Sequence, residues 1–249
     1  MISPYLDVTK LEFVLTDACN GRCRHCSEGT HEGRGTVLDG ALSAKTVRRA
    51  AELLCLETVL VFGGEPLLFP EAAAEILSAA RDADVPRRQV ITNGCFSGAD
   101  ERIREVARLL GAAGVNDLLL SVDAFHAECL DVARALSFAR AALDEGIPMR
   151  LSPAWLVSRE DDNPYNAETR RLLAPFLALG IVEGAGNVIY PEGNARIYLS
   201  EYFLGEIPKN PYLDDPYHVT CLSVSSNGDL LGGNLYRQDL DGILKEYRP

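Results

Sequence analysis

Three cysteines lie within eight residues near the start of the chain: Cys19, Cys23 and Cys26, directly after an apolar run. A structural zinc ion takes four protein ligands and an iron–sulfur cube has four irons. Three thiolates therefore either recruit a distant fourth residue or leave one metal position open. An open metal position can bind a reactant. The spacing thus predicts a metal centre in the loop after the first strand-like segment.

Short apolar runs alternate with helical patterns along the first 190 residues. Strands are predicted at residues 11–16, 58–62, 89–92, 117–122, 148–157 and 187–190. Apolar residues at helical spacing lie between them, and Pro175 is expected to kink or divide the fifth helix. Strands joined by helices run parallel, because a parallel connection needs a crossover. We therefore predict an α/β fold, a partial (β/α)6 barrel of the TIM type.

Short polar motifs follow three of the predicted strands. Gly63-Gly64-Glu65-Pro66 follows the second strand, Asn93 follows the third, and Ser121 and Asp123 lie at the end of the fourth. Parallel strands bring their carboxyl ends to one edge of a sheet, where ligands bind in such folds. The two glycines remove Cβ atoms where backbone must approach a ligand. These motifs are therefore predicted to share one site with the cysteines.

The C-x3-C-x2-C spacing, followed in order by these motifs, resembles the radical S-adenosylmethionine (SAM) superfamily. The resemblance implies one [4Fe–4S] cluster, held by Cys19, Cys23 and Cys26, whose fourth iron is chelated by SAM. It also implies that an electron from a flavodoxin- or ferredoxin-type donor cleaves SAM to a 5′-deoxyadenosyl radical, which abstracts hydrogen from a substrate carbon. His25 departs from the family's usual aromatic residue before the third cysteine.

The same resemblance assigns the SAM contacts. Residues 63–66 are expected to bind the SAM amino group, and Asn93, Ser121 and Asp123 are expected to face the ligand. Arg150, on the fifth strand, is suited to a bidentate pair with the SAM carboxylate. The sixth strand, represented by Val188, is expected to lay its backbone against adenine.

The last sixty residues are expected to form a small appendage to the barrel. The predicted domains are residues 1–190, the barrel, and residues 191–249, a short α/β extension that covers the barrel mouth. A helix is expected over residues 192–203, a hairpin at Asn227-Gly228, and a terminal helix near residues 239–247. This order resembles a reduced twitch or SPASM extension of peptide-modifying members.

Cysteines outside the first three are interpreted one by one. Cys221 alone cannot hold a second all-cysteine cluster. It is either an active-site thiol, for instance a hydrogen-atom donor to a substrate radical, or a small buried apolar residue. Cys55 and Cys129 are interpreted as structural. Cys95, just after the third strand, is left open between the two roles.

The amino-acid composition excludes some classes of binding partner and cellular compartment. The net charge of −12 repels polyphosphate backbones and disfavours a nucleic-acid partner. No apolar span of membrane length is present in the sequence. Seven cysteines without an apolar signal segment favour the reducing cytoplasm over a disulfide scaffold.

The leading hypothesis is a radical SAM enzyme that acts on a peptide or protein side chain. The second is a radical SAM enzyme that modifies a small-molecule metabolite, and the third is a non-catalytic iron–sulfur redox protein. A structural zinc site, with His31 as the other nearby ligand candidate, remains an alternative for the cysteines.

Overall fold

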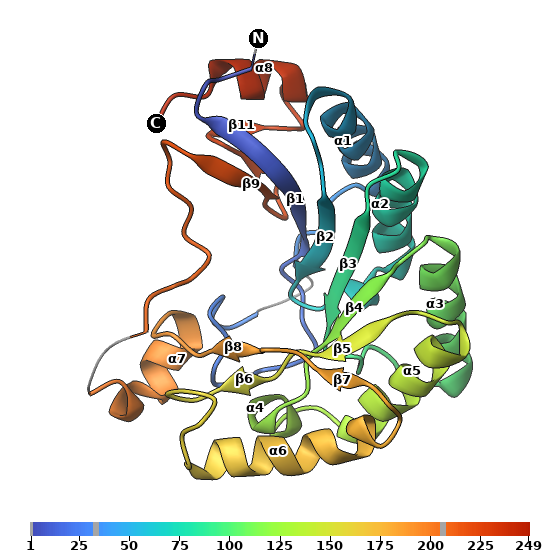
Figure 1. Cartoon of the computed structure of the whole chain (residues 1–249), viewed down its shortest axis with the longest axis vertical. Coiled ribbons are helices and arrows are strands. Elements are labelled where there is room, and N and C mark those ends of the chain that lie inside the picture. Colours follow the sequence, from blue (N-terminus) through green and yellow to red (C-terminus); the bar gives the residue numbers. More distant parts are fainter. Residues whose placement is uncertain (1, 32–34, 205–207) are drawn as a thin grey trace.

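A curved, all-parallel sheet forms the centre of the computed structural model, which describes residues 2–31, 35–204 and 208–249. Figure 1 shows the strands of this sheet side by side, in the order β7-β5-β4-β3-β2-β1-β9. The strands of this sheet are β1 (Leu6–Thr16), β2 (Thr58–Gly63), β3 (Arg87–Thr92), β4 (Asp117–Leu120), β5 (Met149–Leu151), β7 (Val182–Glu183) and β9 (Val219–Val224).

The helices that cross over between these strands stand on one side of the sheet, and the described parts of the loop after β1 and of the segment from Gly193 to β9 lie on its other side (Figure 1). Among the described residues, no helix combines the length and apolar character needed to cross a bilayer. The helices are α1 (Gly40–Leu53), α2 (Pro70–Asp82), α3 (Asp100–Ala112), α4 (Ala124–Ala127), α5 (Val132–Asp144), α6 (Pro164–Leu177), α7 (Gly193–Tyr198) and α8 (Leu240–Glu246), with single turns η1 (Pro66–Leu68) and η2 (Ser200–Tyr202).

The two faces of the sheet differ in character. Leu118 and Leu120 of β4 are fully buried in the main apolar core, against the helices. Side chains alternate along a strand, so Asp117 and Ser121 point to the opposite, inner face. The inner face therefore carries polar side chains along a strand whose outer face is anchored in the core. This is the predicted partial barrel of parallel strands and covering helices.

The fifth predicted strand is divided in two, and the sixth, predicted at residues 187–190, forms a short strand outside the main sheet. The main sheet continues instead with β7, which the sequence did not predict. Residues 148–157 form β5 and then β6 (Ala154–Trp155), and β7 is followed by β8 (Asn187–Val188). The strands β6 and β8 pair with each other in a separate two-stranded sheet. Pro153 lacks an amide proton, and Gly186 has φ +68°, where a Cβ would overlap the Pro153 carbonyl. The chain therefore bends at the same level after β5 and after β7.

The tail adds a strand to the edge of the main sheet and a helix that packs beside it. The strand β9 pairs in parallel with β1, and α8 packs against α1. The turn at Asn227-Gly228 does form, with the Gly228 amide donating to Ser225 O at 2.8 Å. The chain also reverses there, because the Ser225 amide donates to Asp229 O at 3.0 Å, but β9 and the segment after the turn form no ladder of paired strands. The short strands β10 (Asp229–Leu230) and β11 (Gly233–Asn234) pair with each other instead.

Helix α6 continues through Pro175 and ends two residues later, at Leu177. The missing amide of Pro175 therefore affects only the last turn, and the helix is not divided there. At its start, Asn163 caps the helix by accepting the Asn166 amide at 2.9 Å.

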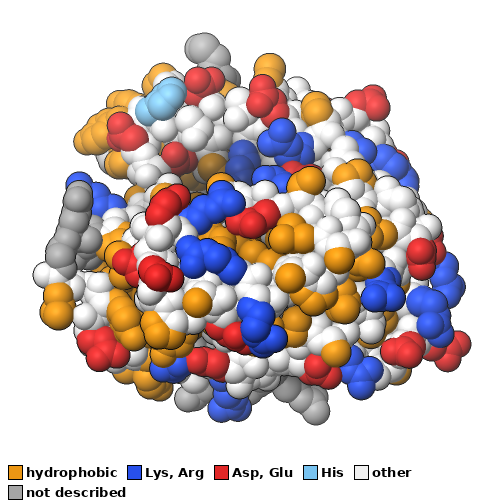
Figure 2. Space-filling model, turned by 60° about the horizontal axis from the view of Figure 1, so that its bottom comes forward, with side chains coloured by type: hydrophobic (Ala, Val, Ile, Leu, Met, Phe, Trp, Pro, Cys, Tyr) orange, Lys and Arg blue, Asp and Glu red, His pale blue; other side chains and the backbone are white. Residues whose placement is uncertain are grey.

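The face of the molecule in Figure 2 carries basic and acidic side chains interspersed with apolar ones. The net negative charge of the sequence is therefore not gathered on this face.

Candidate active site

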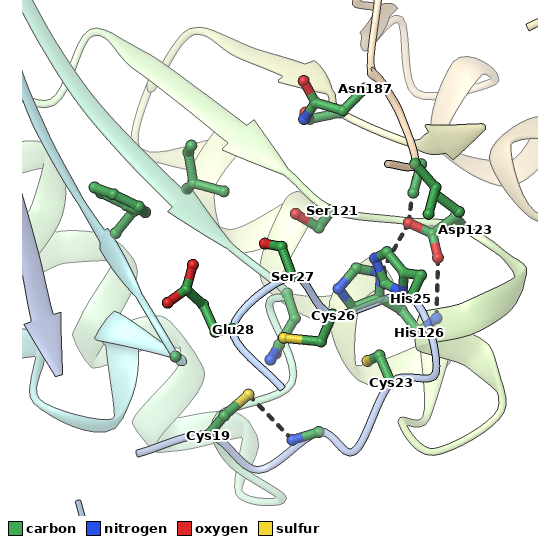
Figure 3. Close-up of a pocket in the computed structure, with 18 of the residues that line it drawn as sticks. Cys19, Cys23, His25, Cys26, Ser27, Glu28, Ser121, Asp123, His126 and Asn187 are labelled. Carbon is green, nitrogen blue, oxygen red and sulfur yellow. Dashed lines mark hydrogen bonds and ion pairs between the residues drawn. The ribbon is translucent and has the colours of Figure 1, made fainter. Parts of the chain in front are cut away.

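The three cysteines lie in the loop that follows β1, which we call the cysteine loop (residues 17–31). Figure 3 shows their side chains beside the end of β4, with Asn187 across the cavity. All three line one cavity of about 250 Å³. The other lining residues come from the ends of β2, β3, β4 and β5 and from β8, and include Gly63, Gly64, Asn93, Ser121, Asp123, His126, Ser152 and Val188. The cavity therefore joins most of the motifs recognised in the sequence.

The distances between the three cysteine sulfurs indicate which kind of metal centre they can hold. A tetrahedral zinc ion, with Zn–S distances of about 2.3 Å, places its sulfur ligands about 3.8 Å apart. Among the described residues, the sulfurs of Cys19, Cys23 and Cys26 do not all lie within 4.8 Å of one another. Cys23 does present its sulfur within 4.8 Å of ring nitrogens of His25 and His126. The three sulfurs are thus spread more widely than the ligand shell of one zinc ion, as a cluster of several irons requires.

The thiols are held in their neutral form in the absence of metal. Burial raises the pKa of Cys19 to about 11. Burial also raises the pKa of Cys23, with a further contribution from neighbouring Cys129, and it raises the pKa of Cys26. Metal binding requires thiolates, so loading this site must release protons.

Asn194, at the start of α7, fixes the cysteine loop from the tail side. Its backbone amide donates to Cys26 O at 2.9 Å, and its side-chain amide donates to Cys23 O at 3.1 Å and to Gly29 O at 3.2 Å. Only 5% of Asn194 is exposed. The sequence reasoning missed this residue, and the available signal was a small Gly-Asn step at the expected helix start.

Gly63 and Gly64 approach the chain itself as well as the cavity. A Cβ on Gly63 would overlap Thr16 O, and one on Gly64 would overlap Ala18 O. The Gly64 amide donates to Thr16 O at 2.7 Å. Gly63 also has φ +135°, which side-chain-bearing residues rarely adopt. The two glycines therefore let the end of β2 pack against the start of the cysteine loop.

Glu65 and Pro66 are not among the lining residues of the cavity. The Glu65 carboxylate is fully buried and accepts hydrogen bonds from the Leu67 amide at 2.9 Å, the Thr92 hydroxyl at 2.7 Å and the Asn93 amide at 2.8 Å. Burial raises the pKa of Glu65 against the opposing effect of these bonds. Glu65 therefore ties the end of β2 to the end of β3, and Pro66 begins η1 beside it.

Asn93 and Ser121 lie at neighbouring strand ends. The Asn93 side chain donates to Asn20 Oδ1 at 3.0 Å and accepts the Cys95 amide at 2.8 Å. Ser121 donates its amide to Thr92 O at 2.8 Å. Within the described part of the chain, the Ser121 hydroxyl has no hydrogen-bond partner, so it is available to a ligand.

Asp123 lines the cavity, but its oxygens are occupied by the protein. Oδ1 accepts the amides of Phe125 and His126, both at 3.0 Å, and Oδ2 accepts the Ala154 amide at 3.1 Å. Oδ2 also lies 2.8 Å from His126 Nδ1. Burial alone would raise the pKa of Asp123, but His126 and His25 hold it below its ordinary value. Asp123 therefore positions α4 and its histidine.

His126 is a cavity residue that the sequence reasoning missed. Burial would lower its pKa, but the Asp123 carboxylate raises it above its ordinary value. Nδ1 faces that carboxylate, so Nε2 is the nitrogen left for other partners. The available sequence signal was a histidine three residues after the aspartate, on the helix that the aspartate caps.

His25 stands where the family's usual aromatic residue is expected. Its ring lies 5.0 Å from the Phe125 ring and 4.9 Å from the His126 ring. Burial lowers the pKa of His25 to about 4, so the ring is neutral near pH 7. Its buried Nδ1 has no partner among the described residues. His25 thus keeps an aromatic surface and a polar ring atom at the cavity.

The short strand β8 forms another wall of the cavity. The amides of Asn187 and Ile189 donate to the carbonyls of Pro153 and Trp155, both at 2.9 Å. Backbone groups alternate along a strand, so the amide and carbonyl of Val188 point away from β6. Tyr212, from the tail, donates a hydrogen bond to Asn187 Oδ1. Within the described part of the chain, the backbone of Val188 therefore has no hydrogen-bond partner, and Val188 lines the cavity.

Arg150 is not placed with the other predicted site residues. It is paired with Asp117 through Nε–Oδ1 at 2.8 Å and Nη2–Oδ2 at 2.7 Å. It lies opposite Leu119 in the register, whereas Ser121 and Ser152 lie nearer the strand ends and line the cavity. The residue that β5 contributes to the cavity is thus Ser152.

Cys221 is also outside the cavity lining. It lies opposite Lys10 in the pairing of β9 with β1. Burial raises the pKa of Cys221 to about 12, with Glu12 as the next cause. The thiol therefore stays protonated beside Glu12, and its predicted catalytic role remains a prediction.

The chain matches the family model described as the Radical SAM superfamily over residues 13–148. This segment is more than half of its 249 residues. The chain therefore belongs to the radical SAM superfamily, whose enzymes use a [4Fe–4S] cluster and SAM.

Solved structures of radical SAM enzymes have the same fold. Streptococcus suis SuiB bound to S-adenosylmethionine is 15% identical with a TM-score of 0.64, over 96% of this chain and 66% of SuiB. This chain thus spans just under two thirds of SuiB's length. Native anSMEcpe with bound AdoMet is 13% identical with a TM-score of 0.59, over 98% of this chain and 81% of anSMEcpe. BtrN in complex with AdoMet and 2-DOIA is 16% identical with a TM-score of 0.50, over 96% of this chain and 88% of BtrN.

Proposed function

We propose that this radical SAM enzyme cleaves SAM reductively and abstracts a hydrogen atom from a peptide or protein side chain. The observation that carries the proposal is the single cavity lined by Cys19, Cys23 and Cys26 together with the strand-end residues and β8. When bound, the cluster and SAM supply the electron transfer and the 5′-deoxyadenosyl radical. A flavodoxin- or ferredoxin-type protein is the proposed electron donor.

The protein's own residues would bind and orient the cofactors. Cys19, Cys23 and Cys26 would hold the cluster. The backbone at Gly63-Gly64 and the free hydroxyl of Ser121 would receive the methionine end of SAM, and the unpaired backbone of Val188 would receive adenine.

Other predicted residues would support the site without contacting the cofactors. Glu65 and Asp123 would keep the strand ends in register through their buried hydrogen bonds. The aromatic rings of His25 and Phe125 would exclude water from one side of the cavity.

A peptide substrate is favoured by the surface of the tail. Six of the eleven large apolar side chains that are exposed in the described structure lie between residues 197 and 217. Tyr212 of this segment also lines the cavity. Exposed large apolar side chains that concentrate in one segment of the chain favour a partner contact there. The six are Ile197, Tyr198, Leu204, Tyr212, Leu213 and Tyr217.

Two of the structural neighbours have been solved with peptides, SuiB with the precursor peptide SuiA and anSMEcpe with the Kp18Cys peptide. We propose the corresponding substrate class here, with residues 191–249 as a reduced twitch or SPASM-like extension beside a barrel of residues 1–190. A small-molecule substrate is the second candidate, because BtrN, solved with 2-DOIA, has a similar fold.

The test begins with anaerobic incubation of the cluster-loaded enzyme with SAM and dithionite. Production of 5′-deoxyadenosine is expected, and its absence would favour a non-catalytic iron–sulfur protein. Deuterated synthetic peptides are then added. Deuterium in 5′-deoxyadenosine and a matching mass change in the peptide would support the proposal. Transfer only from a small metabolite would reject the peptide class.

A further inference from the structure

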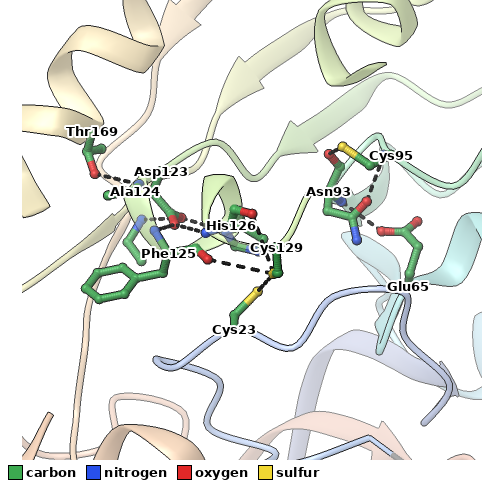
Figure 4. A network of polar contacts seen from close by, with 11 residues as sticks. Cys23, Glu65, Asn93, Cys95, Asp123, Ala124, Phe125, His126, Cys129 and Thr169 are labelled. Atoms are coloured by element: carbon green, nitrogen blue, oxygen red, sulfur yellow. Dashed lines mark hydrogen bonds and ion pairs between the residues drawn. The ribbon is translucent and has the colours of Figure 1, made fainter. Parts of the chain in front are cut away.

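A fourth thiol lies against the three cysteines of the cluster site. Cys129 Sγ is 3.5 Å from Cys23 Sγ, although 106 positions separate the two residues in the sequence. Figure 4 shows the two sulfurs facing each other, Cys23 from the cysteine loop and Cys129 from the turn after α4. The interpretation of Cys129 as a merely structural residue leaves this contact unexplained.

Contacts on either side hold Cys129 in this position. The preceding residue, Glu128, forms a bidentate pair with Arg24, with Nε–Oε2 at 2.8 Å. The Arg22 amide donates to Cys129 Sγ at 3.3 Å. The following residue, Leu130, packs over Gly21, where a Cβ would lie 3.4 Å from its Cδ1. The turn of residues 128–130 and the cysteine loop are therefore joined at three successive positions.

The surroundings of Cys129 also determine where its proton points. Its sulfur accepts the Arg22 amide, so the S–H bond is directed elsewhere. The His126 carbonyl, at 3.6 Å, already accepts the amides of Cys129 and Leu130 at 3.1 and 2.9 Å. The Phe125 carbonyl is farther away, at 3.9 Å. The nearest acceptor is thus Cys23 Sγ at 3.5 Å, which accepts weakly as a thiol and more strongly as a metal-bound thiolate.

The other two cluster ligands have different partners. Cys19 Sγ accepts the Gly21 amide at 3.3 Å, and Cys26 Sγ lies 3.4 Å from His31 Nε2. Among the described residues, Cys23 is the cluster ligand whose sulfur contacts another thiol. Hydrogen bonds to the ligand sulfurs help to set the reduction potential of an iron–sulfur cluster.

We propose that Cys129 is a positioning residue that donates an S–H hydrogen bond to the Cys23 thiolate of the bound cluster and thereby raises the cluster's reduction potential. The inference rests on the proposed function, because it requires the cluster at Cys19, Cys23 and Cys26. Reduction adds negative charge to the cluster and its thiolates, and a donor aimed at one thiolate stabilises that charge. The electron would thus be accepted from a weaker reductant.

The experiment compares the anaerobically reconstituted full chain with Cys129→Ala, Cys129→Ser and, as the matched control, the exposed Cys55→Ala. Iron content is measured first, and the cluster is then titrated potentiometrically by electron paramagnetic resonance without substrate. Cys129→Ala is expected to keep its iron while the ratio of reduced to oxidised cluster at a fixed potential falls about threefold. Cys129→Ser keeps a hydrogen-bond donor, so its ratio of reduced to oxidised cluster should lie between those of Cys129→Ala and the unaltered chain. Cys55→Ala should match the unaltered chain.

A second measurement tests the hydrogen bond itself. After exchange into deuterated water, hyperfine spectroscopy of the reduced cluster should show a coupled deuteron that Cys129→Ala lacks. An intact cluster in Cys129→Ala with unchanged potential and deuteron coupling would overturn the role of Cys129. Loss of iron from Cys129→Ala would also overturn it, because Cys129 would then be a ligand. If the unaltered chain binds no cluster, the proposed function fails as well.

Discussion

Two polar regions lie on the inner face of the same sheet and differ in what their side chains are free to do. At the strand ends, the cavity is lined by backbone, small side chains and the cysteines, and the Ser121 hydroxyl has no protein partner among the described residues. Nearer the strand starts, Asp117 binds Arg150 and also accepts from Gln89 at 2.6 Å. We call the first region the strand-end site and the second the inner-face ion-pair cluster.

The difference shows that a charged side chain on the inner face of the barrel does not necessarily bind a ligand. Charges in the inner-face ion-pair cluster are satisfied by one another, whereas the strand-end site presents groups that remain available. The predictions below test this division, beginning with the largest expected effect.

Cys23→Ala is expected to abolish SAM cleavage, because two thiolates remain where the cluster needs three. The fold should persist, since the cysteine loop lies outside the sheet and its helices. Production of 5′-deoxyadenosine measures the first effect and anaerobic circular dichroism the second. Cys55→Ala is the control that should retain activity. An unfolded Cys23→Ala would make the cluster part of the scaffold and break the division.

Asn194→Ala should lower SAM cleavage about 10- to 100-fold, because residues that orient metal ligands typically contribute that much. Its side chain holds the carbonyls of Cys23 and Gly29. Asn210→Ala, which removes a bond to Glu192 in the same tail, is the matched control. Equal activity of the two variants would show that the cysteine loop holds its shape without the tail.

His126→Gln tests the ion pair beside the cavity. The Asp123 carboxylate raises the pKa of His126. The contribution of the His126–Asp123 pair to the free energy of unfolding is therefore fully present below the ordinary histidine pKa of about 6.5, and it is lost as pH rises through the raised pKa. The pKa of Asp123 is lowered, so its contribution is present above its ordinary value of about 3.9 and is lost only under acid. The variant should therefore lose about 2 kcal/mol of unfolding free energy at pH 6, and less at pH 9.

Chemical denaturation of the reduced, metal-free chain at both pH values gives the measurement. His218→Gln, on the exposed bridge before β9, is the control. A loss that grows with pH would contradict the charged pair.

The sequence was sufficient for features that depend on local pattern. Apolar runs located β1 to β4, and the motif order placed Gly63, Gly64, Asn93 and Ser121 at their ends, because parallel strands share one edge. The family assignment followed from the same residues.

Features that depend on pairing were not accessible in this way. The chain bends after β5 and after β7 where Pro153 meets Gly186, two residues that are 33 positions apart. The partner of β9 is β1, at the other end of the chain. Cys129 and Asn194 contact the cysteine loop from distant segments, and a pattern read along the chain does not show which segments meet.

The inner-face ion-pair cluster gives the smallest expected effect on function. Arg150 was predicted to bind the SAM carboxylate, but its strand register places it one inward-facing position short of Ser152. Arg150→Ala should therefore leave SAM affinity and 5′-deoxyadenosine production within about twofold. It should lower the unfolding free energy by about 1 kcal/mol, because Asp117 loses its bidentate partner.

Ser121→Ala is the matched strand-end variant for this last comparison. Its hydroxyl has no partner among the described residues and lines the cavity, so its removal should weaken SAM binding about fivefold, the effect of one net hydrogen bond, while stability is kept. Equilibrium binding of SAM to the cluster-loaded variants, together with chemical denaturation, separates the two effects. Loss of SAM affinity in Arg150→Ala at unchanged stability would reassign Arg150 to the strand-end site, because an arginine needed only by Asp117 cannot lower the affinity without lowering stability.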